Sequence, residues 1–279
     1  MEHSVFPFRT GLQYVLESNN QIQEARRLFG LLQKEGFYGV ELNLPDLEFI
    51  EPKKLKTLLD EYQLEMTMVA TGAYAKKYGL SLSSNILEER KRAIDGCKSN
   101  IDYAADMGCG IIIGFLKGGA GSRREEAEEL FVESMLELKP YIEKKKVQVL
   151  IEATNHKETT IIRTLEEGAR LIDSLDCSWI RLLADTYHMN IEEDSLVDSL
   201  IKYMKYYPNL HISDDNRAYP GLGRIDFKQI YKNLLTHGYK GTLAVEGNIV
   251  NTCLEDTQKC ADYLHKISSN LYPPSQAVC

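Results

Sequence analysis

Three carboxylates and one imidazole follow short apolar runs at nearly regular intervals in the second half of the chain. They are Glu152, Asp185, His211 and Glu246, separated by 33, 26 and 35 residues. Carboxylate oxygens with one imidazole nitrogen suit hard divalent ions, whereas a structural zinc site favours cysteine. A single carboxylate after an apolar run more commonly caps a helix. Four consecutive positions of this kind, two of them glutamates, instead predict a site for one divalent metal ion.

Two further polar side chains lie in the segments that follow these positions. His188 comes three residues after Asp185, and Arg217 comes six residues after His211. A guanidinium is a planar fork of donors that suits an oxygen-rich ligand. Taken singly, a histidine such as His211 is more commonly an ordinary hydrogen-bonding side chain, and Arg217 a solvated loop charge. The place of His188 and Arg217 beside the candidate ligands predicts that both face the same site.

Short β-branched runs alternate with amphipathic, charge-rich segments along the chain. Strands are predicted over residues 12–16, 39–42, 66–70, 110–115, 147–152, 180–185, 210–212 and 242–246. Helices are predicted over segments such as 87–107, 125–144 and 226–236. The last of these repeats its apolar side chains at the spacing of one helical face.

Glycines mark the points where helices pass into strands. Gly36, Gly108 and Gly238 stand where helix C-caps are expected, and each precedes a second glycine at the start of a strand. This is the αβ turn of a parallel sheet. We therefore predict an α/β protein consisting of a single (β/α)₈ TIM barrel over about residues 10–268 of the single domain 1–279, with a short N-terminal extension and a C-terminal tail over 273–279. A doubly wound open sheet is the alternative, but no GxGxxG follows the first strand.

Composition narrows the range of functions. The 279 residues include 33 basic and 41 acidic side chains, a net charge of −8, which disfavours a nucleic-acid groove. The six cysteines are scattered without a CxxC pair, which is typical of a reduced, cytoplasmic protein. There is no apolar run long enough to span a membrane and no secretory signal at the start. We expect a cytoplasmic protein that binds neither membranes nor nucleic acid.

These segments resemble the xylose-isomerase-like barrel superfamily of sugar isomerases and epimerases, and within it the ketose 3-epimerases typified by D-tagatose and D-psicose 3-epimerases. Residues 185–193 read DTYHMNIEE and are similar to DTFHMNIEE in that group. Residues 211–227 resemble its H-x-x-D-x-x-R…P-G-x-G-x-x-D-F pattern, and 152–158 its E-P-L-N-R-Y-E pattern with Ala153 replacing proline. Segments 70–74, 79–82 and 112–118 resemble a narrower relative, 5-keto-L-gluconate epimerase.

The resemblance implies a role for each candidate residue. Glu152, Asp185, His211 and Glu246 would bind one divalent metal, with Mn²⁺ expected, Co²⁺ or Mg²⁺ as alternatives and Zn²⁺ able to occupy the site. Glu152 and Glu246 would also exchange the proton at C3 from opposite faces of the sugar, through a cis-enediolate. The side chains that would hold substrate oxygens are Glu158, His188 and Arg217. Lys117 would meet a carboxylate or phosphate of the substrate.

The implied activity is metal-dependent epimerisation at C3 of a ketose or keto sugar acid. A 1,2-isomerase of the hydroxypyruvate, inosose or sugar-phosphate type is the alternative, because the same metal site serves proton transfer between C1 and C2. A more distant alternative is an apurinic endonuclease, which needs further histidine ligands. No histidine lies between His3 and His156, so the early loops do not supply them. The resemblance also implies a homodimer or homotetramer.

Overall fold

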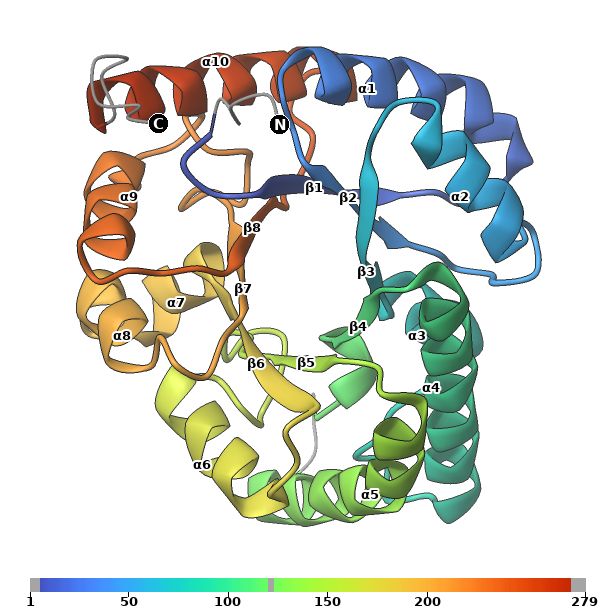
Figure 1. The fold of residues 1–279 in the computed structure, drawn as a ribbon. Coiled ribbons are helices and arrows are strands. Elements are labelled where there is room, and N and C mark those ends of the chain that lie inside the picture. The colour runs from blue at the N-terminus through green and yellow to red at the C-terminus, as the bar shows by residue number, and fades with distance from the viewer. Residues whose placement is uncertain (1–5, 120–122, 272–279) are drawn as a thin grey trace.

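Eight short parallel strands close into one barrel in the computed structural model, which describes residues 6–119 and 123–271. Each strand pairs with the next along the chain, and β8 pairs with β1 (Figure 1). The bounds are β1 Thr10–Val15, β2 Gly39–Asn43, β3 Glu65–Ala70, β4 Gly110–Ile113, β5 Val149–Glu152, β6 Ile180–Asp185, β7 Asn209–Ile212 and β8 Thr242–Val245. The predicted (β/α)₈ barrel is confirmed.

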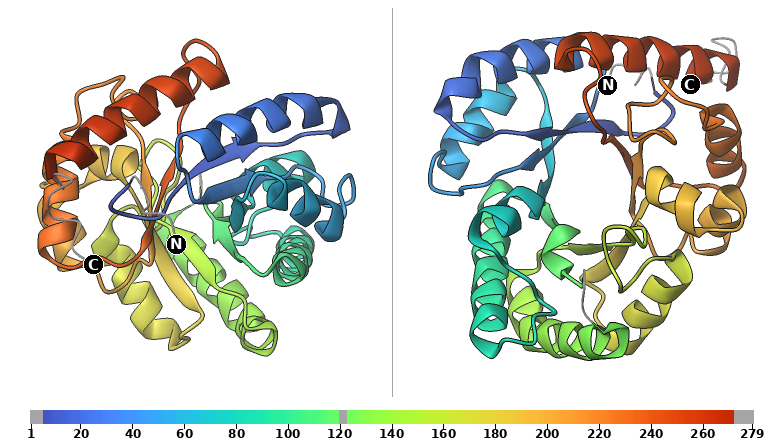
Figure 2. Two further views of the ribbon diagram at one scale, coloured as in Figure 1. Left: turned by 45° about the horizontal axis from the view of Figure 1, so that its top comes forward. Right: turned by 180° about the vertical axis from the view of Figure 1, so that it is seen from behind.

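Helices form a ring outside the strands, as the views in Figure 2 show. The α-helices are α1 Ile22–Lys34, α2 Pro52–Asp60, α3 Gly72–Tyr78, α4 Leu87–Met107, α5 Arg124–Lys145, α6 Leu165–Leu175, α7 Thr186–Glu192, α8 Leu196–Lys202, α9 Phe227–Thr236 and α10 Cys253–Leu271. Two 3₁₀ turns, η1 Asn19–Gln21 and η2 Phe115–Lys117, lie after β1 and β4. The predicted strand 110–115 ends at Ile113 because η2 begins two residues later. The predicted tail over 273–279 lies outside the described residues.

The glycines at the helix ends adopt the conformation that the sequence predicts. Gly36, Gly108 and Gly238 have φ values of 78°, 75° and 73°, in the left-handed region that a residue with a Cβ rarely adopts. At Gly39, the first residue of β2, a Cβ would collide with the carbonyl oxygen of Glu65 on the neighbouring strand. The paired glycines therefore end one element and let the next strand approach the barrel closely.

The interior of the barrel has an apolar side and a polar side. Because side chains alternate along a strand, every second residue points into the barrel. Met68, Ala70, Ile112, Leu150 and Leu183, from β3 to β6, form a small core separate from the large one under the helices. The inward positions of β2 and β7 carry buried polar side chains instead: Glu41, Asn209 and His211. The polar side leads up to the carboxyl ends of the strands, where the candidate ligands lie.

Among residues 6–119 and 123–271, no helix combines the length and the apolar character needed to cross a bilayer.

The cysteines of the described ranges are all free thiols: Cys97, Cys109, Cys177, Cys253 and Cys260. Burial raises the pKa of the Cys97 thiol to about 12, so this side chain behaves as a small apolar residue in the core.

Candidate metal centre

The four predicted ligands come together at the carboxyl ends of β5 to β8. Glu152 and Asp185 are the last residues of their strands, His211 is the third residue of β7, and Glu246 directly follows β8. In the sheet, Asp185 stands opposite His211. Each of the four offers one ligand atom, and all of these atoms lie within 4.8 Å of one another. The spacing of about one βα unit in the sequence thus corresponds to one cluster in space.

Three polar atoms of this cluster are buried and have no partner among the described residues except one another. Glu152 Oε1, His211 Nδ1 and Glu246 Oε2 are all of this kind. His211 Nδ1 lies 2.5 Å from Glu246 Oε2, and 3.8 Å from both Glu152 Oε1 and Asp185 Oδ2. Buried polar atoms without partners are rare in folded proteins, and close carboxylates repel one another. One divalent cation would satisfy all of these atoms, so the donor set fits the metal that the sequence predicts.

Asp185 combines the two roles that the sequence left as alternatives. Its Oδ1 accepts hydrogen bonds from the backbone N–H groups of Tyr187 at 2.8 Å and His188 at 3.2 Å, and so caps α7. Its Oδ2 faces the cluster and accepts a hydrogen bond from Arg217 Nη1 at 2.6 Å. The helix cap therefore holds the carboxylate in one orientation, with the second oxygen available to the site.

Glu41 is a member of this site that the sequence analysis missed. It projects from β2 into the barrel, where its Oε2 lies 2.7 Å from His211 Nε2 and its Oε1 accepts a hydrogen bond from Asn209 Nδ2 at 2.6 Å. A carboxylate on one ring nitrogen keeps the proton there and leaves the other nitrogen free as a ligand. The only signal for it in the sequence is an acid inside the apolar strand 39–42.

The protein alone gives these groups strongly perturbed acidities. Burial raises the pKa of Glu152 to about 8, and the negative charge of Glu246 acts in the same direction. Burial also acts to raise the pKa of Glu246, but Arg217 and His211 outweigh it and hold that pKa well below the usual range. For His211, burial lowers the pKa, yet Glu41 and Glu246 together raise it well above its ordinary value. Protons thus balance part of the negative charge that a metal ion would otherwise balance.

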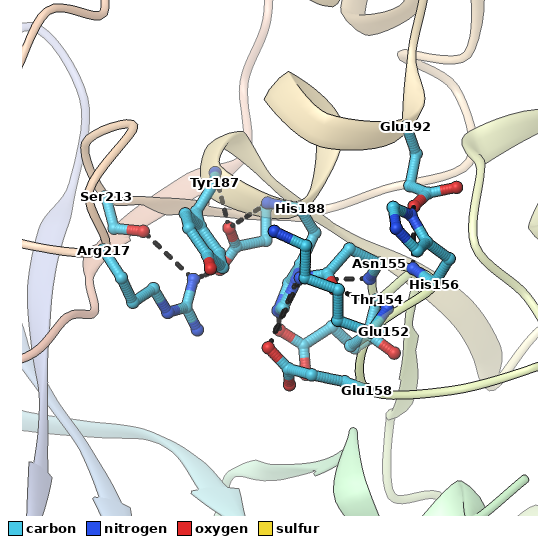
Figure 3. A network of polar contacts seen from close by, with 12 residues as sticks. Glu152, Thr154, Asn155, His156, Glu158, Tyr187, His188, Glu192, Ser213 and Arg217 are labelled. Carbon is cyan, nitrogen blue, oxygen red and sulfur yellow. Dashed lines mark hydrogen bonds and ion pairs between the residues drawn. The ribbon is translucent and has the colours of Figure 1, made fainter. Parts of the chain in front are cut away.

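His188 and Glu158 stand beside the cluster and line the same cavity. His188 Nδ1 accepts a hydrogen bond from the backbone N–H of Asn155 at 3.2 Å, which assigns the ring proton to Nε2. Nε2 lies 3.8 Å from Glu152 Oε1, and burial lowers the pKa of this imidazole. Glu158 Oε1 accepts from Asn155 Nδ2 at 3.3 Å (Figure 3). A neutral imidazole that donates and a carboxylate that accepts therefore face one cavity.

Arg217 reaches the cluster from a tight loop after β7. Its guanidinium lies 2.6 Å from Asp185 Oδ2 and 3.1 Å from Glu246 Oε1. It also lies 3.0 Å from Ser213 Oγ and packs over the ring of Tyr187 (Figure 3). Its φ of 62° lies in the left-handed region, which is strained for a residue with a side chain. Buried Asp214, the aspartate of the H-x-x-D-x-x-R pattern, holds this loop by accepting backbone hydrogen bonds, including one from Gly223 at 2.9 Å.

One cavity of about 640 Å³ opens beside the cluster. Glu152, Glu246, His188, Arg217 and Glu158 line one part of it. The rest is lined from the ends of β1 to β4 and the segments that follow them, by residues that include Gln13, Asn43, Lys76, Ser81 and Phe115. Its volume is within the usual range for small-molecule sites, about 300–1,000 Å³.

Lys117 lies in a different place from the one expected of a group that meets the substrate. Its side chain is buried with 1% exposure, and it is not among the residues that line the cavity. The ammonium donates to the backbone oxygen of Glu152 and to Thr154 Oγ1, both at 2.7 Å. Burial lowers its pKa to about 8. Lys117 therefore stands behind the wall of the cavity and bonds to the strand end that carries Glu152.

Residues 29–265 match a family model described as xylose isomerase-like TIM barrel. The chain belongs to this family. The resemblance to this family seen in the sequence is thereby confirmed. The four candidate ligands therefore lie in a barrel of a known family.

Sugar epimerases are among the similar proteins. The chain is 26% identical over 225 residues to a probable ketose 3-epimerase of Synechocystis sp., covering 76% of this chain and 74% of the relative. It is 28% identical over 244 residues to the L-ribulose 3-epimerase of Methylomonas sp., covering 84% and 82%. A solved structure of a 3-keto-D-glucoside 4-epimerase from E. coli superposes with a TM-score of 0.79 at 23% identity, covering 93% of this chain and 98% of that one. These relatives support the prediction of an isomerase or epimerase.

Proposed function

We propose that this protein epimerises a ketose or a keto sugar acid at C3, using one divalent metal ion held by Glu152, Asp185, His211 and Glu246. The observation that carries the proposal is the cluster of buried ligand atoms, all within 4.8 Å of one another, at one wall of a cavity of small-molecule size. Relatives named as 3-epimerases of ketoses support the substrate class. Mn²⁺ is the ion we expect, with Co²⁺ or Mg²⁺ as alternatives.

Two carboxylates on different strands meet the geometric demand of an epimerase. Inversion requires that a proton leave one face of the carbon and return to the other, so one base is not sufficient. Glu152 ends β5 and Glu246 follows β8, so the two approach the cavity from different strands. A bound divalent ion would supply Lewis acidity that stabilises negative charge on the substrate oxygens while the proton is absent. We assign proton removal and return at C3 to these two glutamates.

The remaining polar groups would orient the sugar. His188 presents its Nε2 proton toward the cavity, Arg217 presents a guanidinium, and Glu158 presents an exposed carboxylate. Donors and an acceptor from three different segments can hold neighbouring oxygens, which fixes the carbon between the two bases. Glu41 keeps His211 in the tautomer whose Nδ1 faces the cluster. We also expect a homodimer or homotetramer, which light scattering after size-exclusion chromatography measures.

The test is exchange of solvent deuterium. The protein is stripped with a chelator, reloaded with Mn²⁺, and incubated in D₂O with L-ribulose, D-psicose, D-tagatose and 5-keto-L-gluconate. NMR should detect deuterium at C3 of a 2-ketose, or at C4 of 5-keto-L-gluconate, which is the corresponding carbon beside its C5 ketone. The epimerised product should appear with it, and the stripped protein should show neither. Deuterium at C1 alone would instead indicate a 1,2-isomerase. Exchange at C4 of a 3-keto-glucoside with none in any free ketose would likewise contradict the assignment to C3.

The endonuclease alternative is tested separately, because it needs a different substrate. Among the described residues there is one group of side chains that could hold a metal ion, and it contains a single histidine. A nicking assay on abasic DNA with added Zn²⁺ should therefore give no cleavage. Cleavage that depends on Zn²⁺ would overturn the proposed function, whatever the result with sugars.

A further inference from the structure

Lys117 is a buried cation whose position the proposed reaction does not by itself explain. It is the last residue of η2, directly after β4, and its two hydrogen bonds go to the oxygen of Glu152 and the hydroxyl of Thr154. Both of these acceptors are neutral, and no carboxylate of the described residues forms an ion pair with the ammonium. Burying a charged group is costly unless partners offset the loss of water. A neutral side chain would be the less costly choice at such a position if packing were its only role.

The segment that carries Lys117 also shapes the place of the Glu152 carboxylate. At Gly114, three residues earlier, a Cβ would run into Glu152 Oε2. The carboxylate therefore lies directly against the backbone of Gly114, while Lys117 holds the main-chain oxygen of the same glutamate. One segment between β4 and α5 thus fixes both ends of Glu152.

The charges around the cluster give Lys117 a second role. Four carboxylates project into this part of the barrel: Glu41, Glu152, Asp185 and Glu246. Arg217 and Lys117 are the arginine and lysine side chains that contact these residues in the described part of the chain. With one divalent ion added, four negative charges face four positive charges. Without Lys117 the cluster would keep an excess negative charge in surroundings of low dielectric.

We infer that Lys117 is a positioning residue for the metal centre: it holds the backbone at Glu152 in place and completes the charge balance, and it does not recognise the substrate. This inference rests on the metal centre of the proposed function. It predicts that the loss of Lys117 weakens metal binding and lowers kcat by the same factor for neutral and for acidic sugars. A lysine that met a substrate carboxylate would instead raise KM for acids alone.

The experiment measures Mn²⁺ affinity by calorimetry, in the absence of any sugar, for the wild type and for Lys117→Met. Methionine keeps an unbranched side chain but removes the charge and both hydrogen bonds. We expect the affinity to fall about 10- to 100-fold, as for loss of other groups that support metal ligands. Lys228→Met, on the exposed face of α9, is the matched control and should bind Mn²⁺ like the wild type. Unchanged affinity in Lys117→Met, or a rise in KM confined to acidic sugars, would overturn the inference.

Thr154 provides a second test that keeps the lysine in place. Thr154→Val removes the hydroxyl acceptor with little change in shape and should weaken Mn²⁺ binding, whereas Thr154→Ser keeps the hydroxyl and should restore it. If circular dichroism shows that Lys117→Met does not fold, this pair of variants tests the positioning role of Lys117 instead. Equal Mn²⁺ binding by both variants would then contradict a role for the hydrogen bond from Lys117 to Thr154. If the wild type itself does not bind Mn²⁺, the proposed metal centre is wrong. If the wild type binds Mn²⁺ and the variants bind it equally well, only the positioning role of Lys117 is wrong.

Discussion

The two halves of the barrel present different chemistry to the same cavity. The ends of β5 to β8 supply the metal cluster together with His188 and Arg217, and most of these side chains are buried. The ends of β1 to β4 supply neutral side chains for the most part, and Lys76 on α3 is a cation among them. Phe115, after β4, lines this half with 53% of its surface exposed. We interpret the half from β5 to β8 as the part that performs the reaction and call it the reacting half. The half from β1 to β4 is interpreted as the part that selects the substrate and is called the selecting half.

This division has a physical basis. Charged groups that act in catalysis must be held rigidly and away from water, and the adjacent strands β5 to β8 do this through backbone register and side-chain hydrogen bonds. Selection of a sugar depends on shape and on neutral hydrogen-bonding groups, which loops supply with less constraint. Substitutions in the two halves should therefore differ in kind: those of the metal ligands and bases in the reacting half should change metal affinity or kcat, and those in the selecting half should change KM.

The largest effect is expected in the reacting half, from Glu246→Gln. Glutamine keeps the shape of the side chain but neither ligates as a charged group nor removes a proton. We expect kcat to fall by about 10²- to 10⁴-fold, the usual contribution of a general acid–base group, with the far-ultraviolet circular dichroism unchanged. Glu255→Gln, at an exposed position on α10, is the control and should turn over normally. Retention of activity in Glu246→Gln would remove this residue from the catalytic role.

Glu41 is an exception to the division between the two halves, because it belongs to β2 but contacts His211 of β7. In Glu41→Gln the amide cannot balance a charged imidazole or hold its Nε2 proton as strongly. We expect Mn²⁺ affinity to fall about 10- to 100-fold, with KM for the sugar little changed. Glu65→Gln on β3, whose side chain is exposed, is the matched control. An unchanged affinity in Glu41→Gln would mean that β7 alone orients the histidine.

Sequence reasoning identified the reacting half well because its signal is local. Each ligand follows an apolar strand, and the βα repeat sets their spacing, so periodicity alone brings Glu152 and Asp185 to one end of the barrel. The helix-cap interpretation of Asp185 holds for one of its oxygens, and the other oxygen faces the cluster, where the ligand prediction requires it. Exact strand ends were less accurate, because His211 lies one residue before the end of β7 and Glu246 one residue beyond β8.

What the sequence could not predict depends on contacts across the barrel. Glu41 and His211 are 170 residues apart, and their contact crosses the interior between strands that are not neighbours in the sheet. Whether Lys117 points into the cavity or behind its wall is likewise set by the turn η2, and the predicted strand 110–115 included only the first residue of that turn. In both cases the residue type was visible, but its direction followed from tertiary packing.

The pH dependence of metal binding offers another measure of the reacting half. In the metal-free protein the pKa of Glu152 is about 8 and that of His211 is also raised. Below these values the groups hold protons that they must lose in order to act as ligands. Apparent Mn²⁺ affinity should therefore rise by about tenfold per pH unit for each proton released, and the contribution of Glu152 should level off above about pH 8. Calorimetry at pH 7 in buffers of different ionisation enthalpy should detect the released protons, and binding without proton release would contradict this charge balance.

The smallest effect is expected in the selecting half, from Lys76→Met. The ammonium of Lys76 lies over the ring of Phe115 at 5.2 Å, and among the described residues no carboxylate forms an ion pair with it. An exposed cation gains up to about 1 kcal/mol from a substrate carboxylate, so KM for a keto acid should rise by no more than about fivefold, and less at high salt. KM for a neutral ketose and kcat for both substrates should not change. Lys77→Met, whose ammonium pairs with Asp46 at 2.7 Å and does not line the cavity, is the neighbouring control. A fall in kcat in Lys76→Met would show that the β1 to β4 half contributes to the reaction itself, and the division between the two halves would have to be abandoned.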